Sequence, residues 1–318
     1  MFIVTWNLDL LAAGADGTNL TQVRSLNPPG GTRLVEIDSG EVARLEGAQP
    51  IPGEVGVAIT SGALAGFRYA KATVGGCFHL FNGKFACAAP NLFPITWDRE
   101  HAGPWETFKL ISREAAEADE KISRDGEGAL KLRVQSLLDQ GKPLRLHFGC
   151  GNTLIPGFLN LDNYAHFGPF GQTEDLFMFD FTQNPWPIPD SSVDYIYSED
   201  FIEHVPQRSQ VGFLAEAFRV LKPGCYNRVS TPCLAESMKA NSDFSKGFTG
   251  VYFGEFDRWA HVALFTKGLF TDLAQAIGYT KVIFNDKGRG LSPYAVQDRR
   301  PGEDRTWKNA NIFADLMK

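Results

Sequence analysis

The chain has 318 residues, which at about 100–200 residues per domain predicts two domains. Its formal net charge is −6 and no run of Lys or Arg stands out, so the basic footprint of a dedicated nucleic-acid binder is missing. No apolar stretch approaches the roughly 20 residues of a membrane span. The 5 cysteines form no CxxC pair, which argues against a disulfide framework or a zinc site and favours a reducing cytoplasm.

The pattern of residues changes near the end of the first third of the chain. Residues 1–112 contain short apolar runs separated by turn residues, which predicts an all-β domain. Residues 113–128 are charged and polar and predict an exposed helix or linker. From residue 129 to residue 318, apolar strands alternate with amphipathic stretches, which is typical of an α/β domain.

The first domain shows signs of an internal repeat. Units starting near Phe2, Val42 and Cys77 are spaced by roughly 35–40 residues. Three such units would make a β-trefoil. The last unit, with its NGKF and GPWETF segments, resembles the repeats of fascin-like trefoil domains, which are mostly binding or packing modules. We expect Trp105 and Phe108 to be core residues of this domain.

In the second domain, an apolar strand at 144–148 runs into Gly149-Cys150-Gly151. Glycines without a Cβ allow a sharp turn and let the backbone lie against a ligand. A second short strand ends at Asp162, where a carboxylate can accept hydrogen bonds from two ribose hydroxyls. Asp162 follows Gly151 by 11 residues, against about 20 in dinucleotide-binding folds. The short gap disfavours an NAD-dependent dehydrogenase.

The alternation of strands and helices continues beyond Asp162. A third strand is predicted to end at Asp180 and a fourth at Tyr197, followed by Glu203-His204. A helix over 211–221 stops at Lys-Pro-Gly, and a fifth strand follows it. The last predicted elements are a helix at 266–277 and strands at 281–284 and 310–316.

The segments HFGCG, PGFLNLD, IPDSSVDYIYSEDFIEH and RVLKPG occur in this order within residues 144–232. Their order and spacing resemble those of Rossmann-like S-adenosylmethionine (SAM)-dependent methyltransferases, close to the small type 11 group. The resemblance implies a seven-stranded α/β sheet whose last strand is antiparallel and lies between the fifth and sixth. The sequence departs from the family at Asp200, where His is common, and at Cys225, which replaces a glycine.

The resemblance also implies a site for SAM as cofactor. The glycine turn would pass beneath the methionine part of SAM, and Asp162 would hold the ribose hydroxyls. Asp180 would lie near the adenine amino group with Phe181 beside the ring, while Ser198 and Glu199 would border the methionine part and the methyl group. The implied cofactor residues are Gly149, Cys150, Gly151, Asp162, Asp180, Phe181, Ser198 and Glu199.

The methyl group of SAM is already activated, so a methyltransferase mainly aligns donor and acceptor and excludes water. A base is needed only where the acceptor must lose a proton, and the candidates are Asp200, His204 and His261. Glu203 and His204 have an alternative structural role in orienting the next helix. The connection 233–261 is rich in aromatic residues between 244 and 259, which suggests either a lid or acceptor pocket or a loop that packs on the other domain. No group of His, Asp and Glu has ligand-like spacing, so no metal is predicted.

The sequence therefore predicts a two-domain, cytoplasmic, SAM-dependent methyltransferase without nucleic-acid or membrane partners. Its acceptor would be a small molecule or a saccharide, positioned by the first domain. The alternative is a non-catalytic binding or scaffold protein that retains the SAM-type fold. The presence of Gly149, Gly151, Asp162 and Asp180 argues against that alternative.

Overall fold

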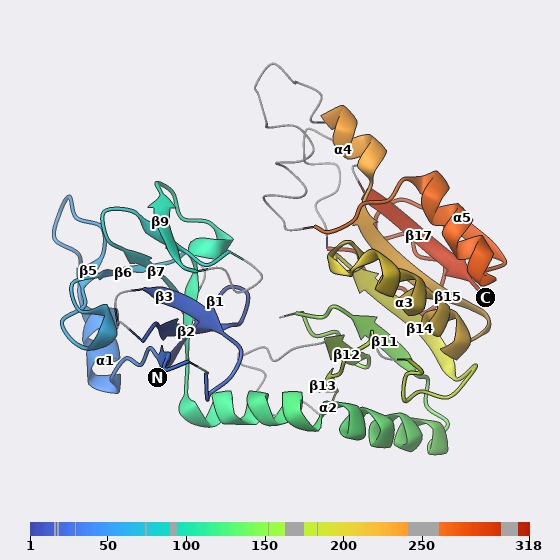
Figure 1. The fold of residues 1–318 in the computed structure, drawn as a ribbon, viewed down its shortest axis with the longest axis horizontal. Helices are drawn as coiled ribbons and strands as arrows, with labels where there is room; N and C mark the ends of the chain where they lie inside the picture. Colours follow the sequence, from blue (N-terminus) through green and yellow to red (C-terminus); the bar gives the residue numbers. More distant parts are fainter. Residues whose placement is uncertain are drawn as a thin grey trace. The chain divides into compact units, whose positions relative to one another are not determined.

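The computed structural model divides the chain into two compact units (Figure 1). The first contains Met1–Arg124, and the second contains the described residues from Asp125 onward. The structure describes residues 1–15, 17, 19–28, 30–73, 75–89, 94–151, 153–162, 175–182, 184–240, 261–299 and 311–318. Within these residues, no helix has both the length and the apolar character that crossing a membrane requires.

The first unit is built around one sheet, as expected of an all-β region. Its strands are β1 (Phe2–Thr5), β2 (Leu10–Ala13), β3 (Leu20–Val23), β4 (Arg33–Leu34), β5 (Val57–Ala58), β6 (Arg68–Lys71), β7 (Cys77–Phe81), β8 (Phe85–Cys87), β9 (Thr96–Arg99) and β10 (Phe108–Ile111). The main strand order is β3-β2-β1-β10-β7-β6-β5, with β4 on β2, β8 on β7 and β9 on β8. The first and last strands of the unit are therefore antiparallel neighbours.

The segment expected to open the middle repeat is a helix. Helix α1 (Ser39–Gly47) includes Val42, and Leu45 is its buried residue. Asp38 caps the helix, because its carboxylate accepts a hydrogen bond of 2.7 Å from the Gly40 N–H. The prediction that a strand opens each of the three repeat units is therefore wrong for the middle unit. In the last unit Phe108 is fully buried, as expected, whereas Trp105, on a short 3-10 helix (Pro104–Glu106), is only half-buried.

The charged stretch after residue 112 is helical. Helix α2 (Arg113–Asp139) spans the boundary between the two units. In its first half, Glu120 accepts hydrogen bonds from the Ser25 hydroxyl (2.9 Å) and the Leu26 N–H (2.8 Å) of the first unit. In its second half, Arg133 donates to Asp175 of the second unit over 2.9 Å. Each half of α2 is therefore anchored within its own unit.

The second unit contains a sheet of order β13-β12-β11-β14-β15-β17-β16. Its strands are β11 (Arg145–Phe148), β12 (Leu159–Asp162), β13 (Leu176–Met178), β14 (Val193–Glu199), β15 (Leu221–Pro232), β16 (Lys281–Phe284) and β17 (Asn311–Met317). Strands β11 to β15 pair in parallel, and β17 pairs antiparallel with both β15 and β16. This is the place that the resemblance implies for the last strand. The carboxyl ends of β11, β12 and β14 consequently lie at one edge of the sheet.

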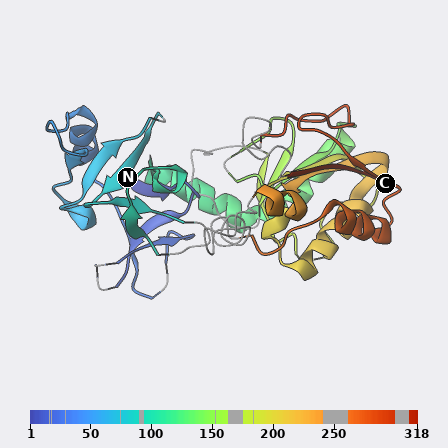
Figure 2. The ribbon, with the colours of Figure 1, turned by 90° about the horizontal axis from the view of Figure 1, so that it is seen from above.

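The two faces of this sheet are covered differently. Successive strand residues alternate between faces, and on one face Phe148 packs in a core cluster with Phe213 of α3 (Gln207–Val220) and Phe270 of α5 (Lys267–Ile277). On the other face Tyr195 and Tyr197 form a smaller cluster with partly buried side chains of the segment 285–299. Figure 2 shows α3 and α5 on one side of the sheet and this segment on the other. A short helix, α4 (Leu234–Ala240), follows β15.

Candidate functional site

The turn after β11 is made by glycines in a left-handed conformation. Gly149 has φ +64° and Gly151 has φ +48°, values that side chains with a Cβ adopt only under strain. A Cβ on Gly149 would stand 2.5 Å from the ring of Phe201, so packing alone requires glycine there. A Cβ on Gly151 would meet no described atom within 4 Å. Gly149 therefore serves the fold, whereas Gly151 borders open space in the described structure.

Asp162 lies beside this turn because β12 is the parallel neighbour of β11. The Gly151 N–H donates a hydrogen bond of 3.0 Å to Oδ2 of Asp162, and the Cys150 N–H donates to the Leu161 carbonyl over 3.2 Å. The Asp162 side chain is largely buried. A carboxylate at the turn is the arrangement that the ribose interpretation needs, and the contact with ribose stays a prediction.

The middle residue of the turn, Cys150, is enclosed by the protein. It is buried, and this burial raises the pKa of its thiol well above the usual value. The thiol therefore stays protonated at neutral pH and is a poor nucleophile. Cys150 can contribute to a cofactor site only through its backbone and its bulk.

The residues after β13 occupy different environments. Asp180 is exposed, and its Oδ1 accepts hydrogen bonds from the N–H (3.0 Å) and the hydroxyl (2.5 Å) of Thr182. Phe181 is buried, and its ring lies 4.8 Å from that of Phe201 and 6.1 Å from that of Phe213, centroid to centroid. The structure thus places Phe181 in the aromatic core, and its contact with an adenine ring stays a prediction.

The carboxyl end of β14 supplies the next predicted residues. Ser198 is buried, and its hydroxyl has no hydrogen-bond partner among the described residues. The Glu199 carboxylate accepts hydrogen bonds of 2.8 and 3.1 Å from the Arg299 N–H. Asp200 is exposed with φ +52°, and its N–H donates to the Ser230 carbonyl over 3.1 Å.

A cavity of about 460 Å³ lies between the loop after the glycine turn, the end of β14 and the segment 285–299. Its wall includes the apolar side chain of Ile155 and the charged side chains of Glu199, Lys287 and Arg299. Arg299 also donates to the Thr153 hydroxyl over 2.8 Å, so it links the segment 285–299 to the loop. The sequence analysis did not predict Lys287 and Arg299 as site residues. The only sequence signal for them is the group of basic residues nearby.

A buried ion network holds the segment 285–299 against the sheet. Arg228 of β15 donates to Asp298 over 2.7 Å and to Asp315 of β17 over 3.1 Å, and all three side chains are buried. Its guanidinium also donates to the Asp286 carbonyl over 3.2 Å. Burial raises the pKa of Asp315, which the positive charge of Arg228 partly offsets. Arg228 thereby fixes the residues next to Lys287 and Arg299.

Two candidate bases are close together. Glu203 and His204 end a short 3-10 helix (Ile202–His204), and His261 comes from a distant part of the chain. The rings of His204 and His261 meet edge to face at 4.9 Å between centroids, and Nε2 of His261 lies 4.0 Å from Oε1 of Glu203. One ligand atom from each of the three side chains falls within 4.8 Å of the others. The structure thus brings together a group that could hold a metal, contrary to the expectation from sequence spacing.

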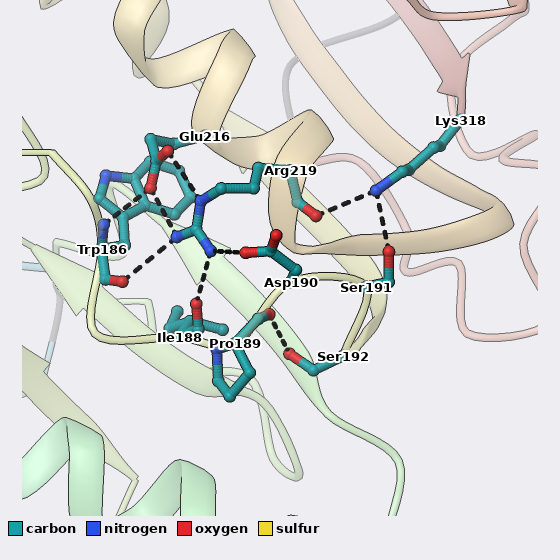
Figure 3. Close-up of polar contacts among 9 residues, drawn as sticks. All are labelled: Trp186, Ile188, Pro189, Asp190, Ser191, Ser192, Glu216, Arg219 and Lys318. Carbon is teal, nitrogen blue, oxygen red and sulfur yellow. Dashed lines mark hydrogen bonds and ion pairs between the residues drawn. The ribbon is translucent and has the colours of Figure 1, made fainter.

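Other motif residues stabilise the fold rather than the site (Figure 3). Arg219 at the end of α3 donates to the carboxylates of Glu216 and Asp190 and to the carbonyls of Ile188 and Trp186. Lys318 donates to the Arg219 carbonyl over 3.0 Å. These bonds tie the loop before β14 to α3. The aromatic stretch 244–259, expected as a lid or packing loop, lies outside the described residues.

Comparison with known proteins found a family model and similar solved structures. Residues 170–227 match the family model described as "Methyltransferase domain". The chain is similar to a SAM-dependent methyltransferase from Archaeoglobus fulgidus, with 14% identity over 63% of this chain and 97% of that chain and a TM-score of 0.38. It is also similar to a "SAM-dependent methyltransferase, possible histamine N-methyltransferase" from Thermotoga maritima, with 16% identity over 62% of this chain and 92% of that chain and a TM-score of 0.38.

A search of curated proteins gave no match. The two structural similarities are weak, so the assignment rests on the family model. The matched domain shows that the protein is an enzyme of the methyltransferase type, with S-adenosyl-L-methionine as its cofactor.

Proposed function

We propose that the second unit transfers the methyl group of SAM by in-line displacement to a small-molecule or saccharide acceptor. The observation that carries this proposal is the bond between the Gly151 N–H and the Asp162 carboxylate at the carboxyl ends of β11 and β12. In open α/β sheets, ligands bind outside the carboxyl ends of the strands. The adenosyl group of SAM would lie over this edge, with Asp162 toward the ribose, and Asp180 and Phe181 toward the adenine.

The cavity next to the turn suits the amino-acid end of SAM. That end carries one ammonium and one carboxylate group, and the cavity wall carries Glu199 together with Lys287 and Arg299. Glu199 and Ser198 end the strand beside β11, so they adjoin the glycine turn in the sheet. We assign Glu199 to the ammonium group and the two basic side chains to the carboxylate group.

The acceptor would lie on the side of Asp200, His204 and His261. An acceptor hydroxyl or amine must lose a proton when it is methylated, and an imidazole is a suitable base near neutral pH. His204 is exposed and His261 is buried behind it. We therefore propose His204 as the side chain that meets the acceptor and His261 as its neighbour, with Asp200 as a further candidate.

For the first unit we propose a trefoil-like domain at 1–112, joined through 113–128 of α2 to the methyltransferase domain at 129–318. The first and third repeat units share a pairing pattern that supports this proposal. Strand β1 pairs with β2 and β2 with β3, while β7 pairs with β8 and β8 with β9. In each of these two units the first strand also contacts the last residues of the unit. The contact is the Phe2–Glu36 bridge in the first unit and the β7–β10 pairing in the third. Helix α1 replaces the corresponding strand of the middle unit.

We further propose that the protein works in the cytoplasm. All five cysteines are free, and four of them are buried. Free thiols at this number are typical of a reducing compartment.

Incubation of the full chain with methyl-labelled SAM and a panel of hydroxylated, aminated and saccharide acceptors tests the function. We expect label in at least one acceptor and an equal amount of demethylated cofactor. Labelled acceptor would be absent with the Asp162→Asn variant at low SAM concentration. Transfer only to a protein or nucleic-acid acceptor would contradict the proposed acceptor class, and the absence of SAM binding by folded protein would contradict the whole proposal.

A further inference from the structure

We propose that Glu203, His204 and His261 form a binding site for one divalent transition-metal ion of the zinc class. The three side chains supply one carboxylate oxygen and two imidazole nitrogens, and their ligand atoms lie within 4.8 Å of one another. This inference goes beyond the proposed methyl transfer and does not depend on it. With an ion bound, His204 and His261 act as ligands, and Asp200 is the candidate base that remains.

The donor set selects the class of metal. Imidazole and carboxylate ligands together suit zinc and its first-row neighbours, whereas magnesium and calcium prefer sites made of oxygen atoms. Three protein ligands also leave a fourth position of a tetrahedral ion open to water or to another molecule. His204 is exposed, so that fourth position would be accessible from solvent.

The carboxylate of the site is held in place before any ion binds. Glu203 is fully buried, and its Oε2 accepts a hydrogen bond of 2.9 Å from the Thr231 hydroxyl at the end of β15. Its other oxygen, Oε1, faces Nε2 of His261 at 4.0 Å. A hydrogen bond behind a ligand fixes its orientation in metal sites, and Thr231 serves that purpose here. A buried carboxylate also costs free energy that a bound cation would offset.

The backbone brings the second histidine to the same point. The carbonyl of Glu203 accepts hydrogen bonds from the N–H groups of Val262 (2.8 Å) and Ala263 (3.2 Å). These bonds attach the residues directly after His261 to the 3-10 helix that carries Glu203 and His204. Backbone hydrogen bonds between two chain segments therefore hold Glu203, His204 and His261 close together.

The site must contract when it takes an ion. Bonds of about 2.0–2.2 Å in a tetrahedron place ligand atoms roughly 3.3–3.6 Å apart, compared with the 4.0 Å between Oε1 of Glu203 and Nε2 of His261. The exposed ring of His204 is the member with most room to rotate, while Glu203 and His261 need only a small approach. The two rings meet edge to face at 4.9 Å between centroids, and their ligand nitrogens lie within 4.8 Å of each other.

Metal titration of the full chain tests the proposal. The purified protein is treated with a chelator, dialysed and titrated with ZnCl₂ against a chromophoric zinc chelator, and separately with CoCl₂ to record the visible absorption of the bound ion. We expect one ion per chain and, with cobalt, the intense bands of a four- or five-coordinate site. The variants are His204→Ala and His261→Ala, with the exposed His101→Ala of the first unit as the matched control.

We expect each of the two site variants to lose at least tenfold in zinc affinity, and the control to retain the wild-type value. The variant Thr231→Val, which removes the hydrogen bond to Oε2 of Glu203, should lose about tenfold in zinc affinity. His204 is exposed, so its variant keeps the test valid even if His261→Ala does not fold. Wild-type protein without one bound ion per chain, or zinc affinity unchanged in His204→Ala, would overturn the inference. Calorimetric titration of the same samples with SAM measures cofactor binding separately. It therefore distinguishes failure of the metal-site inference from failure of the proposed methyl transfer.

Discussion

The backbone N–H of Gly151 donates a 3.0 Å hydrogen bond to the carboxylate of Asp162, joining the glycine turn after β11 to the end of the neighbouring parallel strand. The two residues belong to separate sequence motifs, and the sheet brings them to one edge. A ligand that lies over the turn would meet the carboxylate at the same time. The cofactor site can therefore be tested through these two residues.

The two glycines of the turn should differ in their response to alanine. Gly149→Ala places a methyl group 2.5 Å from the Phe201 ring, so we expect a loss of folding stability of about 2–4 kcal/mol. Gly151→Ala should lose only about 1–2 kcal/mol from backbone strain, while its methyl group enters the space assigned to SAM. Urea unfolding and SAM calorimetry measure the two effects.

The matched control for Gly151→Ala is Gly224→Ala. Gly224 also has a positive φ (+77°), and a Cβ there would meet nothing within 4 Å. The control should lose similar stability and bind SAM normally. Equal SAM affinity in both variants would mean that the turn does not face the cofactor.

Burial of His147 should make the protein sensitive to mild acid. Desolvation lowers the pKa of this imidazole from 6.5 to about 4 in the folded chain, and its hydrogen bond to Asn160 only partly opposes the shift. Between these two values the unfolded chain binds more protons than the folded chain, so the free energy of unfolding falls as the pH falls. The loss over this window is at most about 3.4 kcal/mol.

His147→Gln should remove this part of the pH dependence, because an amide can still donate to Asn160 but does not titrate. The free energy of unfolding, measured by urea denaturation from pH 7 to pH 4.5, should fall less steeply in this variant. The exposed His101→Gln should follow the wild type. Identical slopes for the wild type and His147→Gln would contradict a neutral, buried His147.

Arg228 should be indispensable for the segment that carries Lys287 and Arg299. Arg228→Met leaves the buried carboxylates of Asp298 and Asp315 without their shared cation. Breaking a buried ion pair in this way costs about 3–5 kcal/mol. Thermal unfolding should report the loss, with Arg289→Met as the control, since the side chain of Arg289 is 77% exposed. An unchanged melting temperature would show that the network does not hold the segment.

The turn and its carboxylate could be predicted because both follow short apolar strands that are close in sequence. The pairing of β11 with β12 then needs no distant contact. The motifs on either side of β14 could be predicted in the same way, but the ion pairs that Arg219 makes with Asp190 and Glu216 were not predicted. The local residue pattern and the order of the family motifs are sufficient to predict a contact when its residues are within a few tens of positions of each other.

Two other features were not predicted from the sequence. His261 reaches Glu203 through backbone bonds to Val262 and Ala263, so the ligand group is invisible to a search for spaced motifs. Val42 and Leu45 have the apolar character of a strand but lie in α1, because the Asp38 cap and the single buried face of that segment favour a helix. Tertiary contacts decide the first case, whereas in the second the local cap at Asp38 favours the helix.

Calorimetric titration of the full chain with SAM is the most direct test of the cofactor site. The account predicts saturable binding by the wild type and a roughly tenfold to hundredfold weaker affinity for Asp162→Asn, since a hydrogen bond to a charged group contributes about 1.5–3 kcal/mol. The amide can still accept from Gly151, and Asp272→Asn on the exposed side of α5 should bind like the wild type. Equal SAM affinity for Asp162→Asn and the wild type, with both proteins folded, would contradict the account.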